Sequence, residues 1–133
     1  MKTIRILILE DDLETLAGLL QCLNSLEIEH EGQDIAPTVI SEYTMVEQLL
    51  NRVEKNVFSA ILLDRDCKAG GNFHCLDFNI YPVDRIIGIS STPPYNEELK
   101  QKGVKRLVHK DYQNLDKFIK EVKAQIEDLV FKA

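Results

Sequence analysis

Cysteines and long hydrophobic runs are scarce in this sequence, and each scarcity excludes a class of protein. Cys22, Cys67 and Cys75 are odd in number and contain no Cys-x-x-Cys pair, so neither a disulfide framework nor a zinc site is indicated. No apolar stretch approaches the roughly 18 residues that a membrane span needs. The first apolar run, Ile4–Leu9, contains Arg5 and ends in acids, which is not the pattern of a signal peptide. We therefore expect a cytoplasmic protein that does not enter a membrane.

Positive charge is also in short supply. Sixteen Lys and Arg residues stand against 22 Asp and Glu residues, which gives a net charge of −6 at pH 7. Binding to a nucleic-acid backbone depends on clustered cations, so we expect no nucleic-acid partner. A chain of 133 residues is long enough for one domain with its own core and short for two. We predict a single domain over residues 1–133.

Two apolar runs stop abruptly at acidic residues. Asp64 directly follows the run from Phe58 to Leu63, and Glu10, Asp11 and Asp12 follow the run Ile4–Leu9. Uninterrupted apolar residues are typical of strands that are covered on both faces, as in a parallel sheet packed between helices. Further strands are predicted at Thr38–Tyr43, Val83–Ile89 and Val104–His109.

Segments with helical spacing separate these strands. Helices are predicted at about Asp12–Leu26, Thr44–Lys55, Asn96–Gly103 and Leu115–Val130, with Asp12, Thr44 and Asn96 as N-caps. Residues 27–37 are expected to form a loop with a frayed strand edge, and the Gly-rich residues 67–82 to be irregular, with a short helix near Phe73–Phe78. Five alternating units of this kind predict an α/β fold, a flavodoxin-like (βα)5 doubly wound parallel sheet with strand order 2-1-3-4-5.

Polar residues follow four of the predicted strands. In an open α/β sheet the carboxyl ends of the strands carry the ligand site, and this strand order brings the ends of the first and third strands together. Carboxylates that crowd together repel one another unless a cation is present, and Mg²⁺ with oxygen ligands is the natural partner. A carboxylate nucleophile with Mg²⁺, a hydroxyl and a lysine forms a site for a phosphoryl group. The residues expected to meet are Glu10, Asp11, Asp64, Ser90 and Lys110.

This set of residues, in this order, resembles the receiver domain of two-component response regulators over nearly the full length of the chain. The resemblance implies that Asp64 accepts a phosphoryl group from a histidine kinase or a phosphotransfer protein. It implies that Lys110 pairs with a phosphoryl oxygen and that Ser90 rotates to hydrogen-bond another, which switches a protein-interaction surface. Such a protein assists only its own phosphoryl transfer and hydrolysis, so we expect no enzyme in the usual sense.

The resemblance also implies a set of Mg²⁺ ligands. Asp11 would bind the ion directly, Glu10 mostly through a water molecule, and Asp64 with the phosphoryl group. The backbone carbonyl of Asp66 would be the third direct protein ligand. The protein would be a stand-alone receiver that acts through a protein partner, as a monomer or a weak homodimer.

The sequence departs from the usual receiver pattern at two positions near the lysine. Leu107 stands where receivers commonly have an aromatic residue, and Asp111 stands where they usually have proline, so a trans peptide is expected before Asp111. A degenerate receiver that binds a partner without phosphorylation therefore stays an alternative. Two further alternatives are a Mg²⁺-dependent phosphohydrolase that uses Asp64 and Asp66, and a Mg²⁺ domain of the topoisomerase-primase type that uses Glu10.

Overall fold

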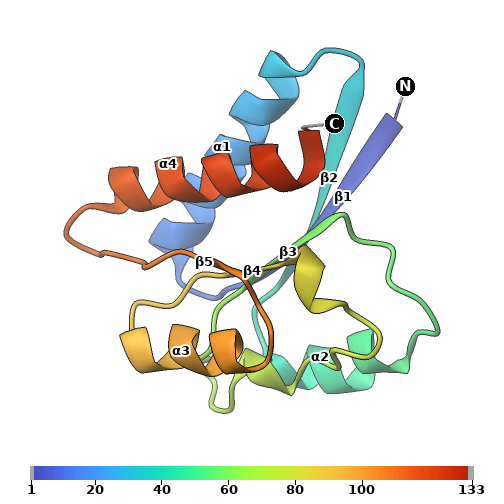
Figure 1. Cartoon of the computed structure of the whole chain (residues 1–133), viewed down its shortest axis with the longest axis vertical. Coiled ribbons are helices and arrows are strands. Elements are labelled where there is room, and N and C mark those ends of the chain that lie inside the picture. The colour runs from blue at the N-terminus through green and yellow to red at the C-terminus, as the bar shows by residue number, and fades with distance from the viewer. Residues whose placement is uncertain (1, 132–133) are drawn as a thin grey trace.

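The computed structural model of the chain describes residues 2–131 and contains one parallel sheet of five strands in the order β2-β1-β3-β4-β5 (Figure 1). This confirms the predicted strand order and the flavodoxin-like α/β fold. The strands are β1 (Lys2–Leu9), β2 (Gln33–Ile40), β3 (Ala60–Leu63), β4 (Ile86–Gly88) and β5 (Arg106–Leu107).

Helices cover both faces of the sheet. On one side lie α1 (Leu13–Glu29) and α4 (Leu115–Ile126), and on the other lie α2 (Tyr43–Gln48) and α3 (Pro93–Gln101) (Figure 1). Short 3₁₀ turns occur at Leu50–Arg52, Phe73–Cys75 and Val83–Arg85, and α4 continues into a π-helical turn at Glu127–Phe131. Within residues 2–131, no helix combines the length and the apolar character that crossing a lipid bilayer demands.

The alternation of β1 side chains explains why the second half of the strand, Ile6–Leu9, is apolar at every position. Ile6 and Ile8 pack in the core cluster formed with α1 and α4, whereas Leu7 and Leu9 pack in the cluster formed with α2 and α3. Because successive strand residues point to opposite faces, a strand between two helical layers must be apolar at every position. The same holds for β3, whose four residues are all buried.

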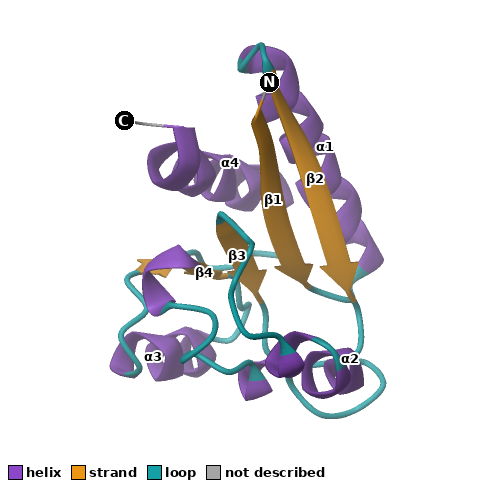
Figure 2. Cartoon of the chain, turned by 90° about the vertical axis from the view of Figure 1, so that its right-hand side faces the viewer, coloured by secondary structure: helices purple, strands orange, loops and turns teal. Residues whose placement is uncertain are grey.

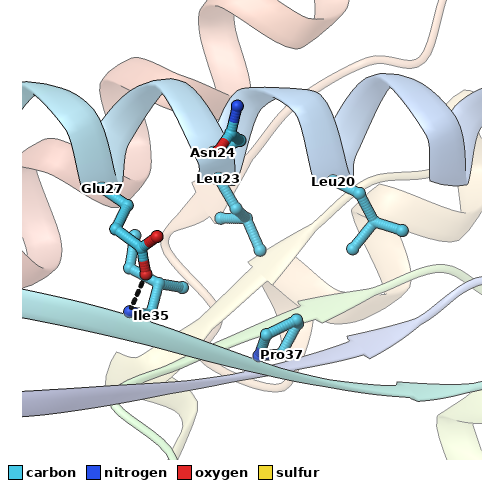
Figure 3. A pocket seen from close by; sticks show the side chains of 6 residues that line it. All are labelled: Leu20, Leu23, Asn24, Glu27, Ile35 and Pro37. Atoms are coloured by element: carbon cyan, nitrogen blue, oxygen red, sulfur yellow. Dashed lines mark hydrogen bonds between the residues drawn. The ribbon is translucent and has the colours of Figure 1, made fainter.

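The predicted loop at residues 27–37 is wrong. The first helix extends to Glu29, and β2 begins at Gln33, pairs with β1 along its whole length and contains Pro37. Because β2 lies at the edge of the sheet, the nitrogen of Pro37 faces outward, where no ladder hydrogen bond is needed. The nitrogen of Ile35, two residues earlier, faces the same way and donates a 2.8 Å hydrogen bond to the Glu27 carboxylate of α1 (Figure 3).

The second predicted helix and its cap also need correction. The helix α2 ends at Gln48, and Glu42 occupies the N-cap position without a side-chain hydrogen bond, so no capping box forms at Thr44. The helix stops at Leu49, which is 57% exposed, and the chain then turns so that the Leu50 side chain enters the core. Helical spacing over Thr44–Lys55 would place Leu49 on the buried face with Met45 and Val53, and the structure contradicts this for Leu49.

The prediction that Asn96 caps the next helix is also wrong. The N-cap of α3 is Thr92, and Pro93 and Pro94 occupy its first positions. Proline is tolerated there because the first N–H groups of a helix lack intrahelical partners. Asn96 lies inside the helix and is 9% exposed.

Three strand predictions were too long, the second strand lies earlier in the chain than the predicted Thr38–Tyr43, and one irregular region was predicted well. The third strand begins at Ala60, two residues after the predicted start. Residues 83–85 form a 3₁₀ turn before β4, and β5 has two residues in place of the six expected. The segment between β3 and β4 contains turns and short 3₁₀ helices, as the glycine-rich sequence indicated.

Candidate functional site

The carboxyl ends of the strands bring the polar residues to one edge of the sheet. In Figure 2 the arrowheads of β1 and β2 point to the same end of the molecule, where α2 lies. Backbone hydrogen bonds continue the sheet past the strand ends: Asp64 N donates to Leu9 O at 3.0 Å, and Lys110 N donates to Ser90 O at 3.0 Å. These bonds fix the backbone from which Asp64, Ser90 and Lys110 project.

Lys110 connects the two buried carboxylates of the site. Its Nζ donates to Glu10 Oε1 at 2.5 Å and to Asp64 Oδ2 at 3.1 Å. The side chains of Lys110 and Glu10 are 1% and 0% exposed, and that of Asp64 is 12% exposed. Charges removed from water in this way are tolerated when they are paired and hydrogen-bonded. Residues from the ends of three strands therefore form one ionic cluster.

The cluster holds more negative charge than its lysine can neutralise. Burial, and then the nearby Asp64 carboxylate, raise the pKa of Glu10 from 4.5 to about 7, while Lys110 counteracts part of the rise. Burial by itself would lower the pKa of Lys110, but the Asp64 and Glu10 carboxylates raise it above its ordinary value. Lys110 is thus held as a cation, and the two acids repel each other across it.

Backbone N–H groups hold the remaining oxygens of the first acidic segment. Glu10 Oε2 accepts from Asp11 N at 3.0 Å and from Asp12 N at 3.1 Å. Asp11 Oδ2 accepts from Lys68 N at 2.5 Å, which brings the loop after β3 against Asp11. Asp12 accepts from the backbone and hydroxyl of Thr15 at 2.9 and 2.7 Å. The prediction that Asp12 caps the first helix is confirmed.

The Ser90 hydroxyl is engaged with the start of α3. Ser90 Oγ accepts a 3.1 Å hydrogen bond from Thr92 N, the N-cap residue of α3. Asn96 reinforces this connection, because its Oδ1 accepts from Ser90 N at 3.3 Å and its Nδ2 donates to Val108 O at 3.2 Å. One buried amide therefore links α3 to the segments that carry Ser90 and Lys110. This role of Asn96 could not be predicted, because an asparagine near a proline pair is typical of a helix cap.

These groups surround an open cavity of about 290 Å³. Glu10, Asp11, Asp64 and Ser90 line it as predicted, and further lining residues include Asp66, Cys67, Thr92 and Tyr112. The sequence analysis missed Tyr112. Its position two residues after Lys110 was the available signal, since a turn after a strand end can return a side chain to the same site.

Asp66 lies at the rim of the cavity, and its carboxylate does not join Asp64. It accepts from Arg65 NH1 at 3.0 Å and is 62% exposed. Arg65 also stacks over the ring of Tyr95, with its guanidinium carbon 3.9 Å from the ring centroid, and contacts Glu98 at 3.4 Å. Arg65, which directly follows Asp64, therefore contacts α3 through two of its residues.

Leu107 and Asp111 lie as their residue types predict. Leu107 packs with the core cluster under α2 and α3. A Cβ added at Gly88 would lie 2.9 Å from Leu107 Cδ2, so the leucine fills the space beside β4 closely. The described residues contain no cis peptide bond, and the peptide before Asp111 is trans as expected.

Oxygen donors dominate the cavity, and they fit a hard divalent cation. Glu10, Asp11 and Asp64 supply carboxylates, which Mg²⁺ and Mn²⁺ prefer to nitrogen or sulfur. A different group of donors lies at the C-terminal end of α1, where ligand atoms of Glu29, His30 and Glu127 are within 4.8 Å of one another. Lysines pair with acids at both places, since Lys123 pairs with Glu29 at 2.7 Å and Lys110 pairs with Glu10 and Asp64. One donor of the second group is a histidine nitrogen, whereas the acids of the cavity offer only oxygens, so the cavity is the better candidate for a hard ion.

Solved structures of response regulators are similar to this chain. The phosphorylated cyanobacterial phytochrome response regulator RcpA has a TM-score of 0.75 at 15% identity, over 98% of this chain and 96% of its own. The Mn²⁺-bound form of response regulator Rcp1 has a TM-score of 0.72 at 12% identity, over 98% and 97%. The bacteriophytochrome response regulator AtBRR has a TM-score of 0.53 at 17% identity, over 90% and 91%.

The sequence itself matches no protein-family description and no curated protein. At identities of 12–17%, the similarity resides in the three-dimensional arrangement. The strand order, the helices on both faces and the near-complete coverage of both chains agree with it. The chain therefore has the fold of the response regulator receiver domains.

Proposed function

We propose that residues 1–133 form a receiver unit that accepts a phosphoryl group on Asp64 from a histidine kinase or a phosphotransfer protein. One observation carries this proposal: the Lys110 ammonium joins Glu10 and Asp64 at the carboxyl edge of the sheet, although the three residues are far apart in sequence. A buried lysine beside a cavity-lining carboxylate prepares that carboxylate for a group that carries negative charge.

Asp64 supplies the nucleophile. Lys110 contacts Oδ2, and we assign Oδ1 as the oxygen that forms the bond to phosphorus. As this bond forms, the bond from phosphorus to the donor's imidazole nitrogen breaks, and its electron pair returns to the imidazole. Lys110 then pairs with an oxygen of the new phosphoryl group, and its charge offsets the charge that has been added.

Mg²⁺ is the cofactor that we assign to the acid-lined cavity. Glu10, Asp11, Asp64 and the backbone carbonyl of Asp66 would hold it, with Glu10 acting through water. When bound, the ion neutralises charge on the carboxylates and on the phosphoryl oxygens. Burial and, after it, the nearby Asp64 carboxylate raise the pKa of Glu10, and both effects disfavour its charged form, which a bound cation would relieve.

The hydrogen bond between Ser90 and Thr92 supports a route from the phosphoryl group to the protein surface. If Ser90 Oγ rotates to a phosphoryl oxygen, Thr92 N loses its acceptor at the N-terminus of α3. The start of α3 must then rearrange, which changes the surface offered to a protein partner. Because Leu107 packs inward in place of an aromatic residue, this route depends on the hydroxyl and on Asn96 rather than on a ring that swings.

The proposal describes a phosphoacceptor and not an enzyme with turnover. A phosphohydrolase of the Asp-x-Asp type needs its second acid beside the first, whereas the Asp66 carboxylate is exposed and paired with Arg65. A degenerate receiver would keep the fold but would not be labelled. The proposed receiver and the degenerate receiver therefore differ in one measurable property, the formation of an acyl phosphate.

Intact-mass measurement after treatment with acetyl phosphate and Mg²⁺ tests the proposal. We expect one added phosphoryl group that is labile to base, and no addition in Asp64→Asn. Asp84→Asn is the matched control, because its carboxylate is exposed and lies outside the cavity, and it should still be labelled. Labelling of Asp64→Asn would disprove Asp64 as the acceptor, and absence of labelling in the unmodified protein would favour the degenerate receiver.

A further inference from the structure

Tyr112 occupies the boundary between the acid-lined cavity and solvent. It is 52% exposed, yet it lines the same cavity as Glu10, Asp64 and Ser90. Its neighbours in the turn before α4, Asp111 and Gln113, do not line this cavity. The Tyr112 ring therefore forms part of the wall of the cavity that Asp64 also lines.

A direct contact with the lysine fixes the position of this ring. Lys110 Nζ donates to the Tyr112 hydroxyl at 3.5 Å and lies 5.4 Å from the centre of the ring. An ammonium group has three N–H donors, and Lys110 has three oxygen partners, on Glu10, Asp64 and Tyr112. The phenol completes the hydrogen bonding of the buried ammonium, and in return the ammonium holds the phenol over the cavity.

We propose that Tyr112 shields the phosphoryl group on Asp64 from water and thereby lengthens the lifetime of the phosphorylated state. This inference rests on the proposed function, which leaves the lifetime of the phosphoryl group open, and it assigns control of that lifetime to Tyr112. In the reaction that Tyr112 slows, a water oxygen forms a bond to phosphorus. The bond between phosphorus and the Asp64 oxygen breaks, its electrons return to the carboxylate, and the water proton leaves with the phosphate or to solvent.

The ring and the hydroxyl of Tyr112 have separate roles in this shielding. The ring occupies space, and the hydroxyl anchors the ring to Lys110. Tyr112→Phe keeps the ring and loses the anchor, whereas Tyr112→Ala loses both. The loss of lifetime should therefore be larger in Tyr112→Ala than in Tyr112→Phe. A residue with a merely structural role would not give this order, because it would alter folding without changing the decay rate in steps.

The experiment measures the decay of the phosphorylated form. The full chain is labelled with acetyl phosphate and Mg²⁺, the donor is removed, and the phosphorylated fraction is followed by intact mass. We expect the half-life to shorten roughly tenfold in Tyr112→Ala and roughly threefold in Tyr112→Phe, in keeping with the loss of a contact to a charged group. Gln113→Ala, in the same turn but outside the cavity, should keep the half-life of the unmodified protein.

The outcomes separate this inference from the proposed function. Normal labelling with equal half-lives in Tyr112→Ala and the unmodified protein would overturn the shielding role and leave Asp64 as the acceptor. Longer half-lives in the variants would also overturn it. If the unmodified protein takes no label, both proposals fail. Thermal unfolding of each variant verifies that it is folded, and Tyr112→Phe keeps the test valid if Tyr112→Ala folds poorly.

Discussion

The Lys110 ammonium lies 2.5 Å from the Glu10 carboxylate, across a separation of one hundred residues in the sequence. This contact joins the end of β1 to the segment that follows β5, at the two sides of the strand that carries Asp64. Neither side chain is accessible to water, so each depends on the other for its charged state.

Lys110→Met should destabilise the metal-free protein at pH 7 by about 3 kcal/mol, because removal of one partner leaves a buried charge uncompensated. Glu10 and Asp64 would then face each other without a cation between them. Urea unfolding measures this loss, and added Mg²⁺ should restore a larger part of the stability than it adds to the unmodified protein.

The Mg²⁺ affinity of Lys110→Met also tests the role assigned to Lys110. Because Lys110 is assigned to the phosphoryl group and not to the ion, its removal should leave Mg²⁺ affinity intact or higher. A lower affinity in Lys110→Met would contradict the assignment. Lys105→Met, at an exposed position before β5, is the control for loss of a positive charge.

Asn96→Ala should destabilise the protein by about 2 kcal/mol, because it leaves the buried Ser90 N and Val108 O without their partner. The adjacent exposed variant Glu97→Ala should stay within about 0.5 kcal/mol of the unmodified protein. Urea unfolding compares the two. Equal stabilities would show that the Asn96 amide does not tie α3 to the sheet.

Asp12→Ala should cost about 1 kcal/mol of stability through loss of the N-cap of α1, without weakening Mg²⁺ binding. Asp11→Ala should instead weaken Mg²⁺ binding, because Asp11 is assigned as a direct ligand. Calorimetric titration with Mg²⁺ separates the two acids. If Asp12→Ala lost the ion, Asp12 would have to be reassigned from cap to ligand.

His74 should make the folded state less stable in acid. Burial lowers its pKa from 6.5 to about 4, and both ring nitrogens are buried without a hydrogen-bond partner. Below pH 6.5 the unfolded chain therefore binds a proton that the folded chain does not bind, so stability falls as the pH decreases from 6.5 towards 4.

His74→Leu removes this titration and isolates its contribution. Between pH 7 and pH 4.5 the unmodified protein should lose about 1–2 kcal/mol more than the variant, after allowance for partial access of solvent to the ring. Urea unfolding at the two pH values gives the difference. Parallel losses in the two proteins would show that His74 takes up its proton equally in both states.

The sequence allowed the strands and the gathering of the acids to be predicted because both depend on strong local signals, whereas the strand order was taken from flavodoxin-like folds. Apolar runs that end in acids, such as those before Glu10 and Asp64, define strands and strand ends together. The parallel topology then forces these ends to one edge. No long-range information is needed for that step.

The errors arose where tertiary context overrides local preference. Pro37 is typical of a loop, yet at a sheet edge its missing N–H has no cost. Asn96 is typical of a cap, yet it satisfies two backbone groups inside the core. Tyr112 enters the site through a turn whose path depends on residues far away, and single-sequence patterns do not report such a path.

The outer side of β2 has a consequence for assembly. An exposed strand edge can pair with a strand of another molecule, because its unpaired N–H groups are able to donate to that strand's carbonyl oxygens. Here the Ile35 N–H is already taken by Glu27, and Pro37 has none to give. A neighbouring copy that approaches this edge therefore lacks two of the N–H donors that strand pairing uses, which disfavours the joining of sheets from separate molecules along β2.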